Sequence, residues 1–255
     1  MRVSVLYSGG KDSNFSAYLA SRAGHEIACL VSMLPQTDES YMFHYPNVHL
    51  TELQAAAMEV PYLRAETKGE KEKELGDLRE LLLGAIEAYG VEGLVTGAVA
   101  SEYQKSRVES LCRNVGLGCL SPLWGVEPAG YMRALIRTGF DVMIVGVSAL
   151  GLGRDWLGRR LDEGLVEELV ALNRKYGVHV AFEGGEAETF VLDSPLFRKR
   201  IELLETEEVW LGDRGRLTIK RAELADKGED SPRREASLMH GGAALETSLT
   251  TETGG

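Results

Sequence analysis

The chain has few cysteines, a deficit of positive charge and no long apolar run. Its three cysteines, Cys29, Cys112 and Cys119, include no C-x-x-C pair, and reduced, mostly buried thiols in a cytoplasmic protein fit this usage best. No apolar stretch approaches the length of a membrane-spanning helix, and no secretory signal precedes the first strand pattern, so we expect no contact with a membrane. The 28 lysines and arginines are outnumbered by 39 aspartates and glutamates, and the net charge of −11 makes nucleic acid a poor partner.

The first half of the chain alternates between strand-like and helix-like segments. Strand patterns cover 3–7, 25–34, 61–65 and 91–98, and helix patterns cover 14–20, 51–58 with Thr51 as N-cap, 70–89 and 101–114. In the helix over 70–89, a buried stripe is predicted by the spacing of Leu75, Leu78, Leu82, Ile86 and Tyr89. This order predicts the α/β class with a doubly wound parallel sheet, in which ligands bind at the carboxyl ends of the strands.

The pattern changes after residues 121–124. A strand is predicted over 141–147 between helix-like segments, another over 178–182, and two more within 200–223 around a hairpin turn at 213–215. We therefore predict a nucleotide-binding domain over 1–122 and a smaller α+β domain over 123–224. Residues 225–255 are polar and poor in aromatics, and we expect them to form a disordered tail.

The most informative motif is the run S-G-G-K-D-S between the first strand and the first helix. Its members are Ser8, Gly9, Gly10, Lys11, Asp12 and Ser13. Two glycines let the backbone turn tightly and aim its N–H groups at one point, and the following helix adds unpaired N–H groups and partial positive charge. Lys11 adds a full charge. The glycines are adjacent, which excludes a Walker A loop, and the run predicts a polyphosphate site.

Two further clusters have less specific signals. On the helix after the strand that ends near Gly97, Tyr103 and Arg107 are four residues apart and share one face. Gly97 would allow the close approach of a nucleotide. A solvated helix face with internal ion pairs is the alternative interpretation. His44, in the segment 39–47 after the second strand, is a candidate for substrate binding or for a structural role.

The third cluster is acidic and surrounds a second glycine pair. Its members are Glu183, Gly184, Gly185, Glu186, Ala187, Glu188 and Thr189. Three carboxylates this close together favour a cation, a metal or a donor-rich ligand. An acidic surface loop explains the composition equally well.

These motifs together resemble one family. Residues 8–13 resemble the pyrophosphate loop of the ATP-pyrophosphatase (PP-loop) superfamily, which implies an adenine-nucleotide α-hydrolase-like fold. Segments 39–44, 97–109, 121–124, 183–189 and 193–197 are similar to those of the diphthine–ammonia ligases, or diphthamide synthetases, and the resemblance runs from residue 1 to about 224. The chain departs from the family at Ala187, where we expect an aromatic residue, and at Phe182, where we expect a glycine.

The resemblance implies a reaction and a set of residue roles. ATP would adenylate the carboxylate of diphthine, a modified histidine of elongation factor 2, and ammonia would then form diphthamide with release of AMP and pyrophosphate. The implied catalytic residues are Lys11, Asp12, Glu183, Glu186 and Glu188. Residues 8–13 and Gly97 would bind ATP, and Asp12 would hold Mg²⁺. The implied substrate-binding residues are His44, Glu102, Tyr103, Gln104, Arg107, Gly184, Gly185 and Thr189. We add the hypothesis that the acidic cluster holds the quaternary ammonium of diphthine or an ammonium ion.

Two alternatives remain open at the level of sequence. One is a PP-loop tRNA-modifying enzyme, although Cys112 and Cys119 match paired sulfur carriers poorly and the net charge disfavours tRNA. The other is a non-catalytic ATP sensor, against which Lys11 and the acidic cluster argue. The oligomeric state, a homodimer included, is not determined.

Overall fold

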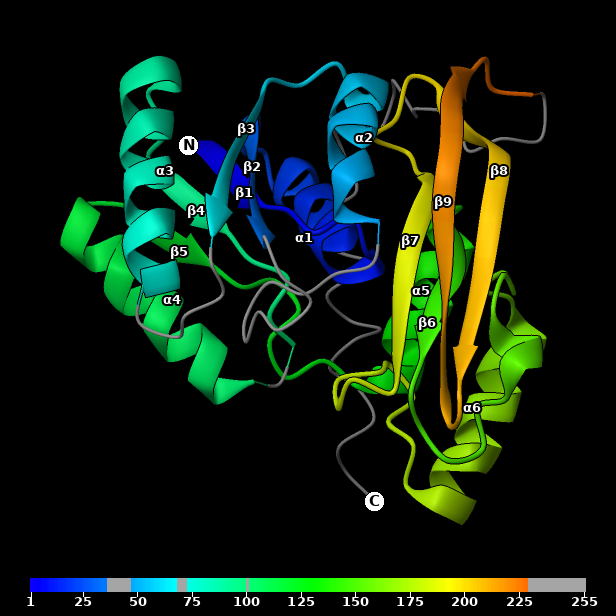
Figure 1. Ribbon diagram of the computed structural model, residues 1–255. Coiled ribbons are helices and arrows are strands. Elements are labelled where there is room, and N and C mark those ends of the chain that lie inside the picture. The colour runs from blue at the N-terminus through cyan, green and yellow to red at the C-terminus, as the bar shows by residue number, and fades with distance from the viewer. Residues whose placement is uncertain (36–46, 68–72, 100, 229–255) are drawn as a thin grey trace. The chain divides into compact units, whose positions relative to one another are not determined.

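The chain folds into two compact units. The computed structural model describes residues 1–35, 47–67, 73–99 and 101–228, and it divides the chain into Met1–Trp124 and Gly125–Gly255. The first unit contains β1 (Arg2–Leu6), α1 (Lys11–Arg22), β2 (Glu26–Pro35), α2 (Thr51–Met58), β3 (Tyr62–Thr67), α3 (Lys73–Tyr89), β4 (Gly93–Val95), α4 (Glu102–Val115) and β5 (Gly118–Leu120). The second contains α5 (Pro128–Thr138), β6 (Asp141–Val147), α6 (Glu163–Tyr176), β7 (Ala187–Asp193), β8 (Arg200–Leu211) and β9 (Arg214–Ala225) (Figure 1).

The first unit is built on a parallel five-stranded sheet in the order β3-β2-β1-β4-β5. The chain runs outward from β1 to β3 and then returns to the other side of β1 with β4. The strand order therefore reverses between β1 and β4, and this switch point is where doubly wound sheets bind ligands. The α/β class and the parallel sheet predicted from the sequence are confirmed.

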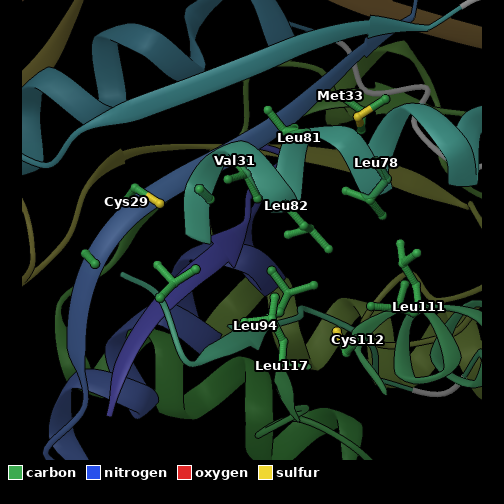
Figure 2. Packing of buried hydrophobic residues seen from close by; sticks show 14 residues of the cluster. Cys29, Val31, Met33, Leu78, Leu81, Leu82, Leu94, Leu111, Cys112 and Leu117 are labelled. Atoms are coloured by element: carbon green, nitrogen blue, oxygen red, sulfur yellow. The ribbon is translucent and has the colours of Figure 1, made fainter. Parts of the chain in front are cut away.

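Helices α3 and α4 cover one face of this sheet, and α1 and α2 lie on the other (Figure 1). Leu78 and Leu82 of the predicted stripe are fully buried against β2, and Leu75, Ile86 and Tyr89 are partly buried around them. Figure 2 shows these leucines beside Cys29, Val31 and Met33 of β2. Because alternate residues of a strand share a face, one amphipathic helix covers every second residue of β2.

Three local expectations for the first unit need correction. The sequence did not indicate β5, because three residues are too few to show a strand pattern. The strand expected over 91–98 is limited to Gly93–Val95. Thr51 is not the N-cap of α2: Leu50 occupies that position, and the Thr51 hydroxyl donates to the Val48 carbonyl at 2.7 Å.

The second unit is an α+β arrangement, as predicted, with an antiparallel sheet in the order β7-β6-β9-β8. β6 matches the predicted strand at 141–147. The strand predicted over 178–182 is wrong, because this segment forms turns and the strand begins only after the glycine pair, as β7. The β8–β9 hairpin turns at Gly212 and Asp213, one residue earlier than expected, with Leu211 opposite Arg214.

The described chain continues a few residues beyond β9. The Lys227 ammonium lies 2.7 Å from the buried Asp193 carboxylate and donates to the Ser194 carbonyl at 2.9 Å. The disorder expected for the tail otherwise concerns 229–255, outside the described residues. Among the helices that the structure describes, none has the length and hydropathy needed to cross a lipid bilayer.

Candidate functional site

The S-G-G-K-D-S run forms the turn from β1 into α1, at the switch point of the parallel sheet. Gly9 has a φ of 83°, in the left-handed region that a glycine adopts without strain. Gly10 is the N-cap of α1, and no side chain caps the helix there. A helix start without a side-chain cap is a place where an anion can bind.

The carbonyl groups of the two glycines face donors in the protein. The Gly10 carbonyl accepts from Asn14 Nδ2 at 2.9 Å and from Ser13 Oγ at 3.2 Å. The Gly9 carbonyl accepts from Gln54 Nε2 of α2 at 3.0 Å. The loop thus holds its acceptors inside the protein.

The two serines of the motif close the turn on itself. Ser8 Oγ lies 3.2 Å from Ser13 Oγ, and the Ser8 N–H donates to Ser13 Oγ at 3.3 Å. Both serines belong to the run that is expected to bind ATP. In this structure they first hold the ends of the turn together.

Lys11 lies under the loop with its charge paired. Its side chain is 3% exposed, and its Nζ lies 3.0 Å from each carboxylate oxygen of Asp12, which is 30% exposed. A buried ammonium is costly unless it is paired, so Asp12 supports the charge of Lys11. The candidate catalytic lysine and the candidate metal ligand are therefore in direct contact.

Gly97 follows β4 and lies against the first turn of α1. A Cβ added there would lie 2.9 Å from the Ser13 nitrogen and 3.0 Å from the Asp12 carbonyl carbon. From the sequence, this glycine is expected to allow the close approach of a nucleotide. The structure shows that it allows the close approach of the loop's own backbone.

A buried polar pair lies behind the loop. The Tyr7 hydroxyl donates to Asn14 Oδ1 at 2.8 Å, and both residues are buried. Burial raises the pKa of the Tyr7 phenol well above its ordinary value. The phenol therefore stays protonated and remains a donor to Asn14.

The cluster on α4 has ion-pair and cation–π contacts. The Arg107 guanidinium lies 4.4 Å from the centre of the Tyr103 ring, so these two residues share a face as predicted. Lys105 Nζ lies 4.1 Å from the centre of the Trp124 ring and 3.8 Å from Glu109. Glu102 is exposed at the start of the helix. The side chain of Gln104 and the whole of His44 lie outside what the structure describes.

The acidic cluster before β7 is organised by Glu186. Its carboxylate accepts from the His179 N–H at 2.9 Å and from the Gly184 N–H at 2.8 Å. The Gly185 carbonyl accepts from Ser148 Oγ at 2.6 Å. Both oxygens of Glu186 thus bind backbone donors of its own turn.

His179 and Phe182 complete this turn. His179 Nδ1 accepts from the N–H groups of Ala181 at 3.2 Å and Glu183 at 3.4 Å, which identifies it as the unprotonated nitrogen in this geometry. Phe182 is buried and has a φ of 63°, in the left-handed region. That conformation explains why the resemblance suggests a glycine at this position.

The remaining residues of the cluster lie along the start of β7. Glu188 is opposite Gly146 and Thr189 is opposite Ile144 on β6, and both are half-buried. Ala187 is buried opposite Val147. Within the described parts of the chain, no three His, Cys, Asp or Glu side chains form a group that could hold a metal ion.

Two cysteines that do not form a C-x-x-C pair in the sequence lie close together in the structure. The thiols of Cys112 on α4 and Cys119 on β5 interact, and this interaction lowers the pKa of Cys119 and raises the pKa of Cys112. Both are free thiols. Their separation of seven positions in the sequence gave no sign of this contact, because it depends on α4 packing against β5.

Several residues that shape the two turns were not predicted from the sequence. Asn14 had a detectable signal, since a polar residue four positions after Gly10 returns to the start of the helix. Gln54 and Ser148 had none, because each reaches its turn from another element. Tyr7 directly precedes Ser8, but no sequence pattern pairs its hydroxyl with Asn14. His179 was placed in a strand that does not form.

Comparison with known families matches both units. The family model for the diphthamide synthase N-terminal domain matches residues 1–119, and the model for the diphthamide synthase C-terminal domain matches residues 127–225.

Individual relatives agree with the family models. A diphthine–ammonia ligase from Homo sapiens is 39% identical over 228 residues, which cover 82% of this chain and 85% of that protein. The Danio rerio protein of the same name is 38% identical over 227 residues, which cover 82% of this chain and 89% of that protein. The Schizosaccharomyces pombe protein is 35% identical, with 37% of its length covered. A solved structure described as a predicted subunit of tRNA methyltransferase from Methanocaldococcus jannaschii is 19% identical, with a TM-score of 0.41 over 75% of this chain and 96% of that one.

Proposed function

Because the chain belongs to the diphthamide synthase family, we propose that it amidates diphthine on elongation factor 2 with ammonia in an ATP-dependent reaction. The observation that carries this proposal is the agreement of both units with the family, together with relatives named diphthine–ammonia ligase that are covered over most of their length. The product is diphthamide, and the reaction consumes one ATP to give AMP and pyrophosphate.

The chemistry divides into two displacements. A carboxylate oxygen of diphthine attacks the α-phosphorus of ATP, and the bond to the pyrophosphate oxygen breaks. The nitrogen of ammonia then forms a bond to the acyl carbon, the bond to AMP breaks, and the surplus protons pass to solvent. Activation is needed because a free carboxylate is a poor acyl donor, whereas AMP is a good leaving group.

The turn after β1 supplies the phosphate-binding half of this chemistry. The uncapped N–H groups at the start of α1 and the Lys11 ammonium would stabilise the negative charge that grows on the departing pyrophosphate. Both belong to the same turn, so one bound phosphate chain could meet the helix N-terminus and the lysine together.

Asp12 is the residue that would hold Mg²⁺. Magnesium on a nucleotide commonly takes one or two protein carboxylates and completes its shell with phosphate oxygens and water, so a single carboxylate at this place fits. Since both Asp12 oxygens contact Lys11 at 3.0 Å, the metal and the lysine would compete for the same group. A triphosphate would relieve this competition by taking over the lysine.

The acidic turn supplies the residues for a cationic group. Glu186 already accepts two backbone hydrogen bonds, so we assign it to shaping the turn. Recognition of the quaternary ammonium of diphthine, or of ammonium, is assigned to Glu183 and Glu188.

The test uses the purified chain with ATP, ¹⁵N-ammonium and elongation factor 2 that carries diphthine. The proposal expects AMP to be released only when both ammonium and diphthine-bearing elongation factor 2 are present, with ¹⁵N in the modified histidine. Mass spectrometry of elongation factor 2 from a strain that lacks this protein should show accumulated diphthine. Normal diphthamide in that strain would refute the proposal. A tRNA-modifying enzyme would instead respond to tRNA, and a sensor would bind ATP without forming AMP.

A further inference from the structure

Gln54 connects α2 to the phosphate-binding turn. It is fully buried in the middle of α2, 45 positions after Gly9 in sequence, and its Nε2 donates to the Gly9 carbonyl at 3.0 Å. No sequence motif includes it, and its neighbours on α2 are mostly alanines. A buried amide side chain at this place needs a reason, since burial of a polar group is costly without a partner.

The hydrogen bond decides which way a peptide group of the turn faces. In a trans peptide the carbonyl of one residue and the N–H of the next point in opposite directions. With the Gly9 carbonyl directed to Gln54, the Gly10 N–H is turned away, toward Ser8 Oγ, which it reaches only at 3.4 Å. That long contact leaves the Gly10 N–H able to donate to a stronger acceptor.

The peptide group between Gly10 and Lys11 is held in the same orientation, in this case by side chains of α1. The Gly10 carbonyl receives donors from Asn14 and Ser13 of α1, so the Lys11 N–H also points away from the interior. The Gly10 carbonyl has several donors, whereas within the described chain the Gly9 carbonyl has one side-chain donor, Gln54. Gly9 lies in the left-handed region, and a glycine can leave that conformation at little cost. Loss of Gln54 would therefore release the least restrained peptide.

We propose that Gln54 is a positioning residue for polyphosphate: by holding the Gly9 carbonyl, it presents the Gly10 N–H to the phosphate chain of the nucleotide. The inference rests on the proposed function for its ligand, and it adds a residue and a mechanism that the motif does not contain. Free pyrophosphate and the terminal phosphates of ATP share the chemistry that this turn recognises. AMP lacks it.

The experiment compares Gln54→Met, which keeps length and burial but removes the donor, with the wild type. The control is Glu52→Met, on the same helix but exposed and paired with Arg64 on the surface. Isothermal titration calorimetry measures the affinities for ATP, inorganic pyrophosphate and AMP. Gln54→Met should lower the affinity for ATP and for pyrophosphate roughly tenfold, because a single hydrogen bond to the turn is lost. The affinity for AMP should stay unchanged. Glu52→Met should match the wild type for all three ligands.

Amide hydrogen exchange in the protein without nucleotide gives a second readout. Gln54→Met should speed exchange at Gly10 and Lys11 and leave the amides of β4 unchanged. The inference would be overturned if the variant bound ATP and pyrophosphate with the affinity of the wild type, or if it lost the same affinity for all three ligands. Unchanged amide exchange at Gly10 would also overturn it. If the wild type binds neither ATP nor pyrophosphate, the proposed function fails, and the exchange rates alone then decide whether Gln54 holds the turn.

Discussion

Within the described residues, two glycine pairs lie beside charged residues, one in each unit, and the structure uses them in opposite ways. At Gly9 and Gly10 the carbonyl groups are bound by side chains of the protein, and the N–H groups at the start of α1 have no side-chain cap. At Gly184 and Gly185 the Gly184 N–H is bound by Glu186, and the Gly185 carbonyl by Ser148. The first turn presents donors, whereas the second uses its own carboxylate to satisfy them.

The difference arises from the element that follows each pair. A helix leaves its first N–H groups without internal partners, so a turn that enters a helix has donors to offer. A strand pairs its N–H groups with a neighbour, and β7 pairs with β6 along its whole length. A glycine pair therefore indicates an anion site only when a helix follows it and a cation lies beside it, as Lys11 does here.

The largest effect is expected from Lys11→Met, which removes the cation from the first turn. AMP formation should fall on the order of 100-fold or more, since electrostatic stabilisation of the leaving pyrophosphate is lost. The rate of AMP release in the presence of ammonium and diphthine-bearing elongation factor 2 measures this. Arg22→Met, at the exposed end of the same helix, is the matched control and should retain the wild-type rate. Equal rates for the two variants would remove Lys11 from the mechanism.

The second turn is tested by Glu186→Gln. This change replaces one carboxylate oxygen with an NH₂ group that faces a backbone N–H, so one of the donors at His179 or Gly184 loses its partner. Amidation should fall about tenfold, while the affinity for ATP stays unchanged.

Ser148→Ala separates the shape of this turn from its charge. It removes the hydrogen bond to the Gly185 carbonyl without changing any carboxylate. A similar loss in both variants supports the shaping role that we assign to Glu186. Complete loss of amidation in Glu186→Gln alone would show that its charge acts in the reaction, and normal turnover in both would remove the turn from the site.

A smaller effect, on stability as well as binding, is expected from Gly97→Ala. The new Cβ would meet backbone atoms of Asp12 and Ser13 at about the distance of a clash, so the first turn of α1 must shift. The free energy of unfolding should fall by roughly 1–3 kcal/mol, as in other overpacked sites, and the affinity for ATP should fall with it. Gly118→Ala is the control in the same sheet, because its nearest contact is an ordinary 3.7 Å. If denaturant unfolding gave equal losses for both variants, the close approach at Gly97 would not matter.

The smallest effect concerns how the stability contributed by the Tyr7–Asn14 hydrogen bond depends on pH. Burial keeps the pKa of Tyr7 well above its ordinary value in the folded protein, so the folded state binds this proton more tightly than the unfolded state does. The stability linked to Tyr7 is therefore present below pH about 10 and is lost as pH rises from there toward the folded pKa.

Tyr7→Phe isolates this contribution. At neutral pH the variant should lose about 0.5–1.5 kcal/mol, the usual contribution of one hydrogen bond, because Asn14 loses its donor. The difference in the free energy of unfolding between the wild type and the variant, measured in urea, should shrink as pH rises above about 10. A constant difference across that range would mean that the phenol is not protected by burial.

Local patterns predicted most of the first unit. The stripe of Leu78 and Leu82 identified α3, and the alternation of strands and helices identified the parallel sheet. The errors share a cause. The run at 178–182 has the apolar composition of a strand, but Phe182 lies at a positive φ and the segment turns. Thr51 has the residue type of an N-cap, but its hydroxyl bonds elsewhere.

The candidate site shows the same division. Residues 8–13 were found because the turn, the charge and the helix that follows are contiguous in sequence, whereas Gln54 and Ser148 act from other elements. The acidic cluster was found by composition, but its internal hydrogen bonds were not. A resemblance that suggested glycine at position 182 pointed to the backbone conformation that Phe182 adopts.

The sequence alone determined that this protein has a glycine-rich turn between a strand and a helix, a parallel sheet to hold it and the family to which it belongs, because each depends on residues close together in the chain. Only the tertiary structure decided which peptide groups of the turn are bound by side chains of the protein. A peptide group can rotate to present either its carbonyl or its N–H, and the choice depends on the donors that distant elements bring to it. In this protein the donor from α2 is Gln54, and it turns the Gly9 carbonyl inward.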